Sequence, residues 1–326
     1  MTALGFAEIW LLAFVVLAGF VVGGLGLLMI GHLMSEEWLK PIRSETEAAA
    51  LTAPLLAVIA LPLAFVLDDL YPWASETPLG LPQPRALYLS PSFFLLRSAI
   101  YLAVWTALAV WIVRTTTPRR ASVVGLALLA PTATFAANDW VLSRDPLWWS
   151  SLFGFSFALS QLLAALAGGI LISLLRREYP GSVRMQSLER ALLTLALLVL
   201  WSWFVQFLIV WLANLPHEAA WYLARSQGTR LWLMAGIAVP TLVAAILILA
   251  PPGFGRRVMM VGSALLLVHH AAHMAWILRP VSGGPAGWDL VVAIGLGAAW
   301  AAWFAAALRR RPADESEPAP GTSEPA

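Results

Sequence analysis

The sequence contains no cysteine and few charged residues. Cysteine is absent from all 326 positions, which excludes disulfide bonds, covalently attached c-type haem and iron–sulfur clusters held by thiolates. Only 12% of the residues are charged, whereas soluble domains carry about 25%. The chain is therefore too apolar to be a soluble domain, and any redox centre that it works with belongs to a partner chain.

Long apolar stretches dominate what is present. Apolar residues make up 60% of the chain, and the mean hydropathy is +0.79. A helix needs about 20 apolar residues to cross a bilayer, and the stretches that meet this length are 6–31, 50–67, 93–113, 121–140, 149–175, 188–213, 231–250, 258–278 and 287–308. We therefore predict an all-α membrane domain of nine spans over residues 1–311. Residues 312–326 form a Pro-rich, acidic tail that we expect to be disordered.

The basic residues predict the orientation of these spans. With nine spans, the amino terminus lies on one side of the membrane, here named side A, and the carboxyl terminus lies on the other, side B. Of the 20 Lys and Arg residues, side A receives Arg85, Arg97, Arg144, Arg225, Arg230 and Arg279. The remainder fall on side B, and cytoplasmic loops carry the excess of Lys and Arg. We expect side B to be cytoplasmic and side A to be periplasmic, in a bacterial inner membrane.

Charged groups are missing from the estimated midplane of every span. Ion-coupled transporters and proton pumps usually keep Asp, Glu, Lys or Arg there, so this absence weighs against a transporter. The polar side chains that remain inside the spans include Ser156, Ser160, Gln161 and Gln206. Gly19 and Gly23 form a GxxxG pattern in the first span, which predicts close helix packing.

The stretch 198–225, LVLWSWFVQFLIVWLANLPHEAAWYLAR, combines a Trp-rich span with a polar end. Gln206 and Asn214 share roughly one side of this helix, and His217 and Glu218 follow directly after it. An imidazole beside a carboxylate can exchange protons with a ligand near the membrane surface. The alternative is a boundary cap, because His, Glu and Trp also suit a membrane interface.

Other polar and aromatic residues gather on side A. Asp68 and Tyr71 follow the second span, Arg97 begins the third, and Asp139 and Trp140 end the fourth. This bias to one face fits either a ligand site or a docking surface for an extracytoplasmic partner.

We combine these residues into one hypothesis for a polar pocket at the side A boundary. Its members are Asp139, His217 and Glu218, backed by Gln206, Asn214 and Arg97 and walled by Trp140, Trp149 and Trp211. Carboxylates and an imidazole in such a pocket would accept protons from a quinol and release them outward. The alternative is structural: Asp139 caps the fifth span, or pairs with Arg97 and fixes the helices together.

Three histidines lie in the eighth span. His269 and His273 are four residues apart and face one way, and His270 lies between them. They fit hydrogen-bonded interior groups, contacts to a proton or a quinone, or ligands of haem. Haem held within a bundle usually takes ligands from two helices, and we predict no metal site. Asp68, Tyr71, Gln161, His269 and His273 are therefore secondary site candidates.

Several segments together resemble one protein family. They are WLKPIRSETEAAALTAPLLAVIALPL, DDLYPW, LYLSPSFFLLR, TFAANDWVLSRDPLWWSSLFG, FVQFLIVWLANLPHEAAWYLAR and ILRP. They resemble the ActF-type, NrfD-like membrane subunit (quinone-binding subunit 2) of bacterial alternative complex III, from about Trp38 to Pro280. The family motif usually reads Pro-Glu-Glu where this chain has His217 in the middle position, so no family role is carried over to His217.

The resemblance implies a subunit of a quinol:electron-acceptor (cytochrome c type) oxidoreductase. The implied fold is two antiparallel four-helix bundles with peripheral helices, ten spans in all, one of which would precede residue 1. Implied partners are an ActC-type NrfD-like membrane subunit and periplasmic subunits that hold c-type haem and iron–sulfur centres. The implied ligand is menaquinone or ubiquinone, bound without a covalent link. The other readings are an ActC or polysulfide-reductase type subunit with its own quinol site, a transporter and a purely structural anchor.

Overall fold

The computed structural model describes residues 3–34, 37–75, 80–176, 183–250, 255–278 and 287–310. Within these ranges the chain is helical without strands, and nine helical segments are long and apolar enough to span a membrane. They are Gly5–Leu33, Lys40–Phe65, Pro91–Arg114, Pro118–Arg144, Phe153–Arg176, Met185–Ala213, Trp232–Leu249, Arg256–Leu278 and Val291–Arg309. The predicted all-α membrane protein is confirmed. The tail 312–326 lies outside the described residues.

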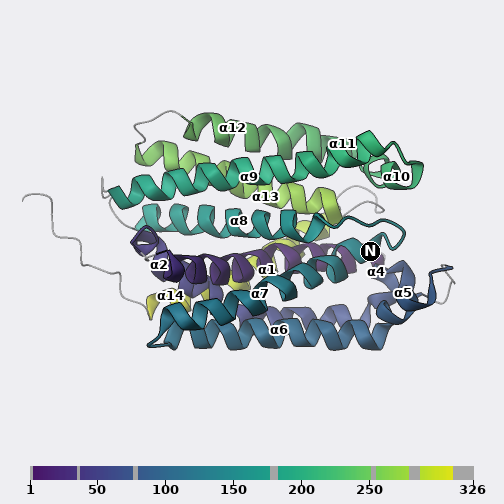
Figure 1. Cartoon of the computed structure of the whole chain (residues 1–326), viewed down its shortest axis with the longest axis horizontal. Helices are drawn as coiled ribbons and strands as arrows, with labels where there is room; N and C mark the ends of the chain where they lie inside the picture. The colour runs from purple at the N-terminus through teal and green to yellow at the C-terminus, as the bar shows by residue number, and fades with distance from the viewer. Residues whose placement is uncertain are drawn as a thin grey trace, which may run out of the picture.

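The spans form two antiparallel four-helix bundles and one peripheral helix (Figure 1). The first bundle contains α1 (Ala3–Leu33), α2 with α3 (Arg43–Ala50 and Ala53–Ala60), α6 (Pro91–Arg114) and α7 (Pro118–Trp140). The second contains α8 (Phe153–Arg176), α9 (Val183–Ala213), α12 (Val239–Leu249) and α13 (Arg256–Leu278). The peripheral helix α14 (Gly287–Arg309) packs on α1, α2 and α3.

Glycines let α1 pack closely against α8, where the two bundles meet. A Cβ atom added at Gly23 would overlap the backbone of Gln161, and one added at Gly19 would overlap the Gln161 side chain. Small residues allow helix backbones to approach in this way. The close helix contact predicted from Gly19 and Gly23 is therefore the contact that joins the bundles.

The second span starts at Lys40, earlier than the expected residue 50. Its first turns are η1 (Lys40–Ile42) and α2, which contains two buried carboxylates, Glu45 and Glu47. Arg176 donates a hydrogen bond to Glu45 at 2.6 Å, and Arg43 donates one to Glu47 at 3.0 Å. These ion pairs allow a charged segment to lie inside the fold, which an apolar pattern alone does not reveal.

The seventh span contains an irregular segment. After α11 (Thr229–Leu231), the chain forms a π-helix, η5 (Trp232–Ala238), and then α12, which carries Pro240 in its first turn. Proline has no N–H group and cannot complete the helical hydrogen bond to the preceding turn. The wider π-helix at this position leaves backbone carbonyls for other partners.

Short helices connect the spans on side A. They are α4 (Leu67–Leu70), η3 (Pro72–Ala74), α5 (Gln83–Tyr88), η4 (Leu142–Arg144) and α10 (Pro216–Ala224). In Figure 1 the labelled helices α4, α5, α10 and α11 lie at the same end of the molecule, on the right. The sequence-predicted site residues fall mostly on these connections and on the span ends beside them.

Candidate functional site

Asp139 forms a complete set of hydrogen bonds at the side A end of the first bundle. Arg97 on α6 donates from Nε to Oδ2 at 2.8 Å and from Nη2 to Oδ1 at 3.0 Å. The Tyr101 hydroxyl donates to Oδ2 at 2.8 Å, and Asp139 is fully buried. Both oxygens of the carboxylate are therefore occupied, which corresponds to the structural alternative in which Asp139 pairs with Arg97.

The Arg97 side chain also binds Tyr88, at the end of α5. Its Nη1 donates to the Tyr88 carbonyl at 2.7 Å, and its guanidinium lies over the Tyr88 ring at 3.8 Å from the centroid. Burial, with the nearby negative charge of Asp139, raises the pKa of Tyr88 to about 12. The Tyr88 phenol therefore remains protonated at neutral pH.

A cavity of about 340 Å³ lies beside this cluster and is named here the Asp139 cavity. Its polar lining residues are Arg85, Tyr88, Asn138, Asp139 and Ser143, and Trp149 forms an aromatic side. Asn138 Oδ1 is buried without a hydrogen-bond partner, whereas the Asp139 carboxylate is already satisfied. The cavity surface is mostly apolar despite these polar residues, and the Asp139 carboxylate is not free for a ligand.

Two further ion pairs lie on side A, and the sequence reasoning missed both. Arg144 Nη2 donates to Glu8 Oε1 at 2.6 Å, and both side chains are buried. Arg225 Nη2 donates to Asp145 Oδ2 at 2.6 Å. One signal for the first pair was available, because Glu8 is the single carboxylate inside the first apolar stretch and such a group requires a partner.

Gln206 connects three elements on side A of the second bundle. Its Oε1 accepts a hydrogen bond from Ser150 Oγ at 3.0 Å, and its Nε2 donates to the Tyr222 hydroxyl at 3.3 Å. Burial raises the pKa of Tyr222 to about 12, despite the opposing effects of Gln206 and Arg225. Gln206 thus joins α9 to the loop before α8 and to α10.

The other residues around the end of α9 lie at the surface. Asn214 has a φ of 50° and forms the left-handed turn between α9 and α10, a position where Asn is favoured. His217 is exposed, Glu218 is half-buried, and Trp211 is 65% exposed. The Glu218 carbonyl accepts a hydrogen bond from Trp148 Nε1 at 3.1 Å. Neither the Asp139 cavity nor the aromatic cavity described below is lined by His217 or Glu218.

Trp140, Tyr71 and Asp68 belong to the first bundle. Trp140 is buried, and its Nε1 donates to Ser98 Oγ at 2.9 Å. The Tyr71 hydroxyl donates to the Trp140 carbonyl at 3.0 Å, and burial raises the pKa of Tyr71. Asp68 is exposed. Trp140 and Tyr71 therefore pack and bond the loops to the bundle, while Asp68 lies on the surface.

A second cavity, of about 410 Å³, lies in the second bundle and is named the aromatic cavity. It lies between α9, the η5–α12 span and α13, with α10 at its side A end. Residues of its lining that bear on binding are Trp203, Tyr222, Arg225, His269, His273 and Trp276. Three residues of the lining are exposed on the outer surface of the helices: Phe204, Phe207 and Leu231. The cavity therefore borders the lipid.

His269 lines this cavity, and one of its ring nitrogens has no hydrogen-bond partner. Its Nδ1 lies 2.8 Å from the Ala238 carbonyl of η5. Because a carbonyl can only accept, Nδ1 carries the hydrogen, and Nε2 of the neutral ring is an acceptor. His269 Nε2 is buried without a partner.

His273 lies one helical turn further along the same face. Its ring packs edge-on against Trp203 at 4.7 Å and nearly parallel to Trp276 at 5.8 Å. His273 Nδ1 is also buried without a partner. The aromatic cavity therefore combines a flat, apolar wall with two buried nitrogen atoms that have no hydrogen-bond partner.

His270 and Gln161 face elsewhere. The His270 ring lies 6.3 Å from the Phe20 ring of α1, and Gln161 Nε2 contacts Met274 Sδ at 3.9 Å. Neither residue lines the aromatic cavity. Among the described residues, no three His, Asp or Glu side chains gather closely enough to hold a metal ion.

The fold and these contacts define a class: an all-α, multi-pass membrane protein with buried carboxylates held in ion pairs at both ends of its helices. Comparison of the sequence with protein-family models and with curated proteins gives no match.

Proposed function

We propose that this chain is an integral-membrane subunit of a quinol:electron-acceptor oxidoreductase of the alternative complex III type. In this proposal the first bundle is a scaffold and the aromatic cavity of the second bundle binds the quinol. The partners are an ActC-type membrane subunit and periplasmic subunits that carry c-type haem and iron–sulfur centres. The protein lies in the bacterial inner membrane with side A in the periplasm.

One observation carries the ligand part of the proposal: His269 and His273, each with a buried ring nitrogen that has no hydrogen-bond partner, line the same cavity as Trp203 and Trp276. Buried polar atoms are almost always hydrogen-bonded, so His269 Nε2 and His273 Nδ1 mark a place where a polar partner fits. Pockets for small molecules are mostly apolar with a few placed polar groups and occupy about 300–1,000 Å³. The aromatic cavity, at about 410 Å³, fits a ring with hydroxyl groups.

When bound, a quinol supplies two electrons and two protons to the complex. His269 Nε2 accepts a hydrogen bond from a ring hydroxyl, and the Ala238 carbonyl holds the imidazole in that orientation. Trp203 and Trp276 exclude water from the ring, which strengthens polar contacts inside the cavity. Tyr222 and Arg225 line the side A end of the cavity, the end from which a proton leaves in this proposal.

A second reading, the structural anchor, is favoured by the ion pairs. The Asp139 carboxylate is fully satisfied by Arg97 and Tyr101. In this reading the chain only supports a neighbouring subunit that holds the active quinol site.

The first experiment tests the complex. The protein is purified from its native membrane through a carboxyl-terminal tag in mild detergent, and co-purifying subunits are identified by mass spectrometry and haem spectra. We expect haem-containing subunits at a fixed ratio. Recovery of the chain alone would contradict the assignment to a complex.

The second experiment tests the cavity with matched histidine variants. His269→Leu and His273→Leu should lower quinol oxidation by the assembled complex at least tenfold, equivalent to about 1.4 kcal/mol of barrier. His270→Leu is the control, because His270 is buried on the same helix but does not line the cavity. Equal activity in all three variants, with normal assembly, would leave only the anchor reading.

A further inference from the structure

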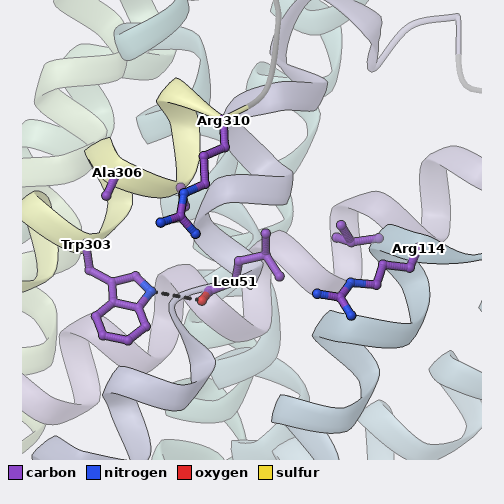
Figure 2. A pocket seen from close by; sticks show the side chains of 7 residues that line it. Leu51, Arg114, Trp303, Ala306 and Arg310 are labelled. Atoms are coloured by element: carbon purple, nitrogen blue, oxygen red, sulfur yellow. Dashed lines mark hydrogen bonds between the residues drawn. The ribbon is translucent and has the colours of Figure 1, made fainter.

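A third cavity, of about 500 Å³, lies at the opposite, side B end of the helices. Figure 2 shows the side chains that line it, with Arg114 and Arg310 reaching toward it from two different helices. Arg114 is the last residue of α6, and Arg310 follows the end of α14. Both arginines therefore lie where a spanning helix leaves the membrane.

The two arginines carry unneutralised charge. Within the described part of the chain, neither guanidinium forms an ion pair or hydrogen bond, and both side chains are exposed. The buried carboxylates of α2 are already engaged, because Glu45 binds Arg176 and Glu47 binds Arg43. The positive charge at this cavity is thus available to an anion from outside the described fold.

The rest of the lining is apolar and fixed in place. Leu51, Val113, Ala306 and Ala307 form this part of the surface. The Trp303 indole donates a hydrogen bond to the Leu51 carbonyl at 3.3 Å, which joins α14 to the end of α2 (Figure 2). Ala306, whose side chain is a single methyl group, lines the cavity on the same helix as Trp303 (Figure 2).

We propose that this cavity binds the headgroup of an anionic phospholipid from the side B leaflet. The two guanidinium groups bind the phosphate, since Arg matches phosphate oxygens with paired N–H donors. The apolar side takes the first carbons of the acyl chains, and Trp303 suits the membrane interface. Basic pockets between spanning helices on the cytoplasmic side bind anionic lipids in this way. This proposal does not depend on the quinol assignment.

Two other negatively charged groups compete with a lipid for this cavity, and the experiment below distinguishes them from it. The acidic tail contributes Asp314, Glu315 and Glu317 shortly after Arg310 in the sequence. Free inorganic phosphate is the second. A lipid differs from both because its acyl chains use the apolar side of the cavity.

The experiment is native mass spectrometry of the full chain in detergent with added lipid. Phosphatidylglycerol, phosphatidylcholine and inorganic phosphate are titrated separately, and the bound fraction is measured. We expect phosphatidylglycerol to bind at least tenfold more tightly than phosphatidylcholine. Inorganic phosphate should neither bind measurably at millimolar concentration nor displace the lipid.

Variants locate the binding. Arg114→Gln and Arg310→Gln should each weaken phosphatidylglycerol binding about fivefold, the effect of one basic residue near an anionic membrane surface. Arg309→Gln is the matched control, because Arg309 is on the same helix but does not line the cavity. Ala306→Phe keeps the charge and fills the space, and it should weaken binding by a similar factor.

Three results would overturn the proposal. The first is an equal loss in Arg309→Gln and Arg310→Gln, which would indicate general surface charge. The second is unchanged binding in Ala306→Phe. The third is lipid binding that appears only after deletion of residues 312–326, which would make the tail the occupant.

Discussion

The guanidinium of Arg97 holds both carboxylate oxygens of Asp139, at 2.8 and 3.0 Å. The pair joins α6 to α7 in a site where Asp139 has no contact with solvent. A buried ion pair of this kind is costly to break, because removing one member leaves the other charge buried and unpaired. The main role of Asp139 is therefore to stabilise the first bundle.

Replacing Asp139 tests this assignment. Asp139→Asn should lower the free energy of unfolding by about 3–5 kcal/mol, the usual cost of breaking a buried pair. The measurement is unfolding by titration with sodium dodecyl sulfate, followed by circular dichroism. The double variant Arg97→Met with Asp139→Leu should recover most of the loss. Normal stability of Asp139→Asn with at least tenfold slower quinol oxidation would instead make Asp139 a site residue.

The pair between Arg225 and Asp145 should be weaker. Arg225 is buried, but the Asp145 side chain is 33% exposed, so water screens the interaction. We expect Asp145→Asn to cost less than half of what Asp139→Asn costs in the same titration. An equal or larger loss of stability in Asp145→Asn would show that solvent exposure does not determine the relative strength of these two ion pairs.

The contact between α1 and α8 depends on the absence of a side chain at Gly23. Gly23→Ala should destabilise the protein by about 1–3 kcal/mol, because the new methyl group overlaps the Gln161 backbone and forces the helices apart. Gly295→Ala on α14 is the control, since no atom lies within 4 Å of the added Cβ. It should be neutral or stabilising. An unchanged free energy of unfolding in Gly23→Ala would contradict the close contact between α1 and α8.

Tyr222 should make the protein sensitive to alkaline pH. Its pKa is about 12 in the folded protein against an ordinary value of 10.0, and burial is the main cause. Below pH 10.0 both states keep the proton, so this contribution to stability is fully present. It is lost as the pH rises toward 12, because the unfolded state ionises first. Tyr222→Phe should show a smaller loss over this range in unfolding measured at several pH values.

The orientation can be tested with single cysteines, because the chain has none of its own. Gln227→Cys lies beyond α10 on side A, and Thr116→Cys lies between α6 and α7 on side B; both positions are exposed. A membrane-impermeant maleimide added to spheroplasts should label only Gln227→Cys. Labelling of Thr116→Cys alone would reverse the proposed topology.

The number of spans was predictable because hydrophobicity and helix length are local properties. The start of the second span was harder to predict from the sequence. Glu45 and Glu47 count as polar in any apolar pattern, yet Arg176 and Arg43 pair with them inside the fold. The Arg43–Glu47 pair is local, four residues apart on one helix, but the Arg176–Glu45 pair is long-range and is decided by packing, which a single sequence does not display.

The same difference between local and long-range features separates the site residues that the sequence predicted from those that it did not. Arg97 and Asp139 were named together from their places at span ends, and the structure brings them into contact. Asn214 was chosen because it shares a helix side with Gln206, and His217 with Glu218 as an imidazole beside a carboxylate. The structure leaves Asn214 and His217 exposed after the left-handed turn at Asn214, and Glu218 half-buried. The partnerless nitrogens of His269 and His273 depend on where η5 places the Ala238 carbonyl, and a rare π-helix is not readable from composition.

The central position of α1 has a consequence for biosynthesis. Of the spanning helices in the described residues, α1 has the largest buried share, 83%, and it contacts helices of both bundles and α14. It precedes its neighbours α8, α13 and α14 in the chain, so these helices are made later. During translation α1 must therefore wait in lipid with Glu8 unpaired until Arg144 has been synthesised. A membrane insertase that shelters polar groups is the kind of helper that such an order of synthesis requires.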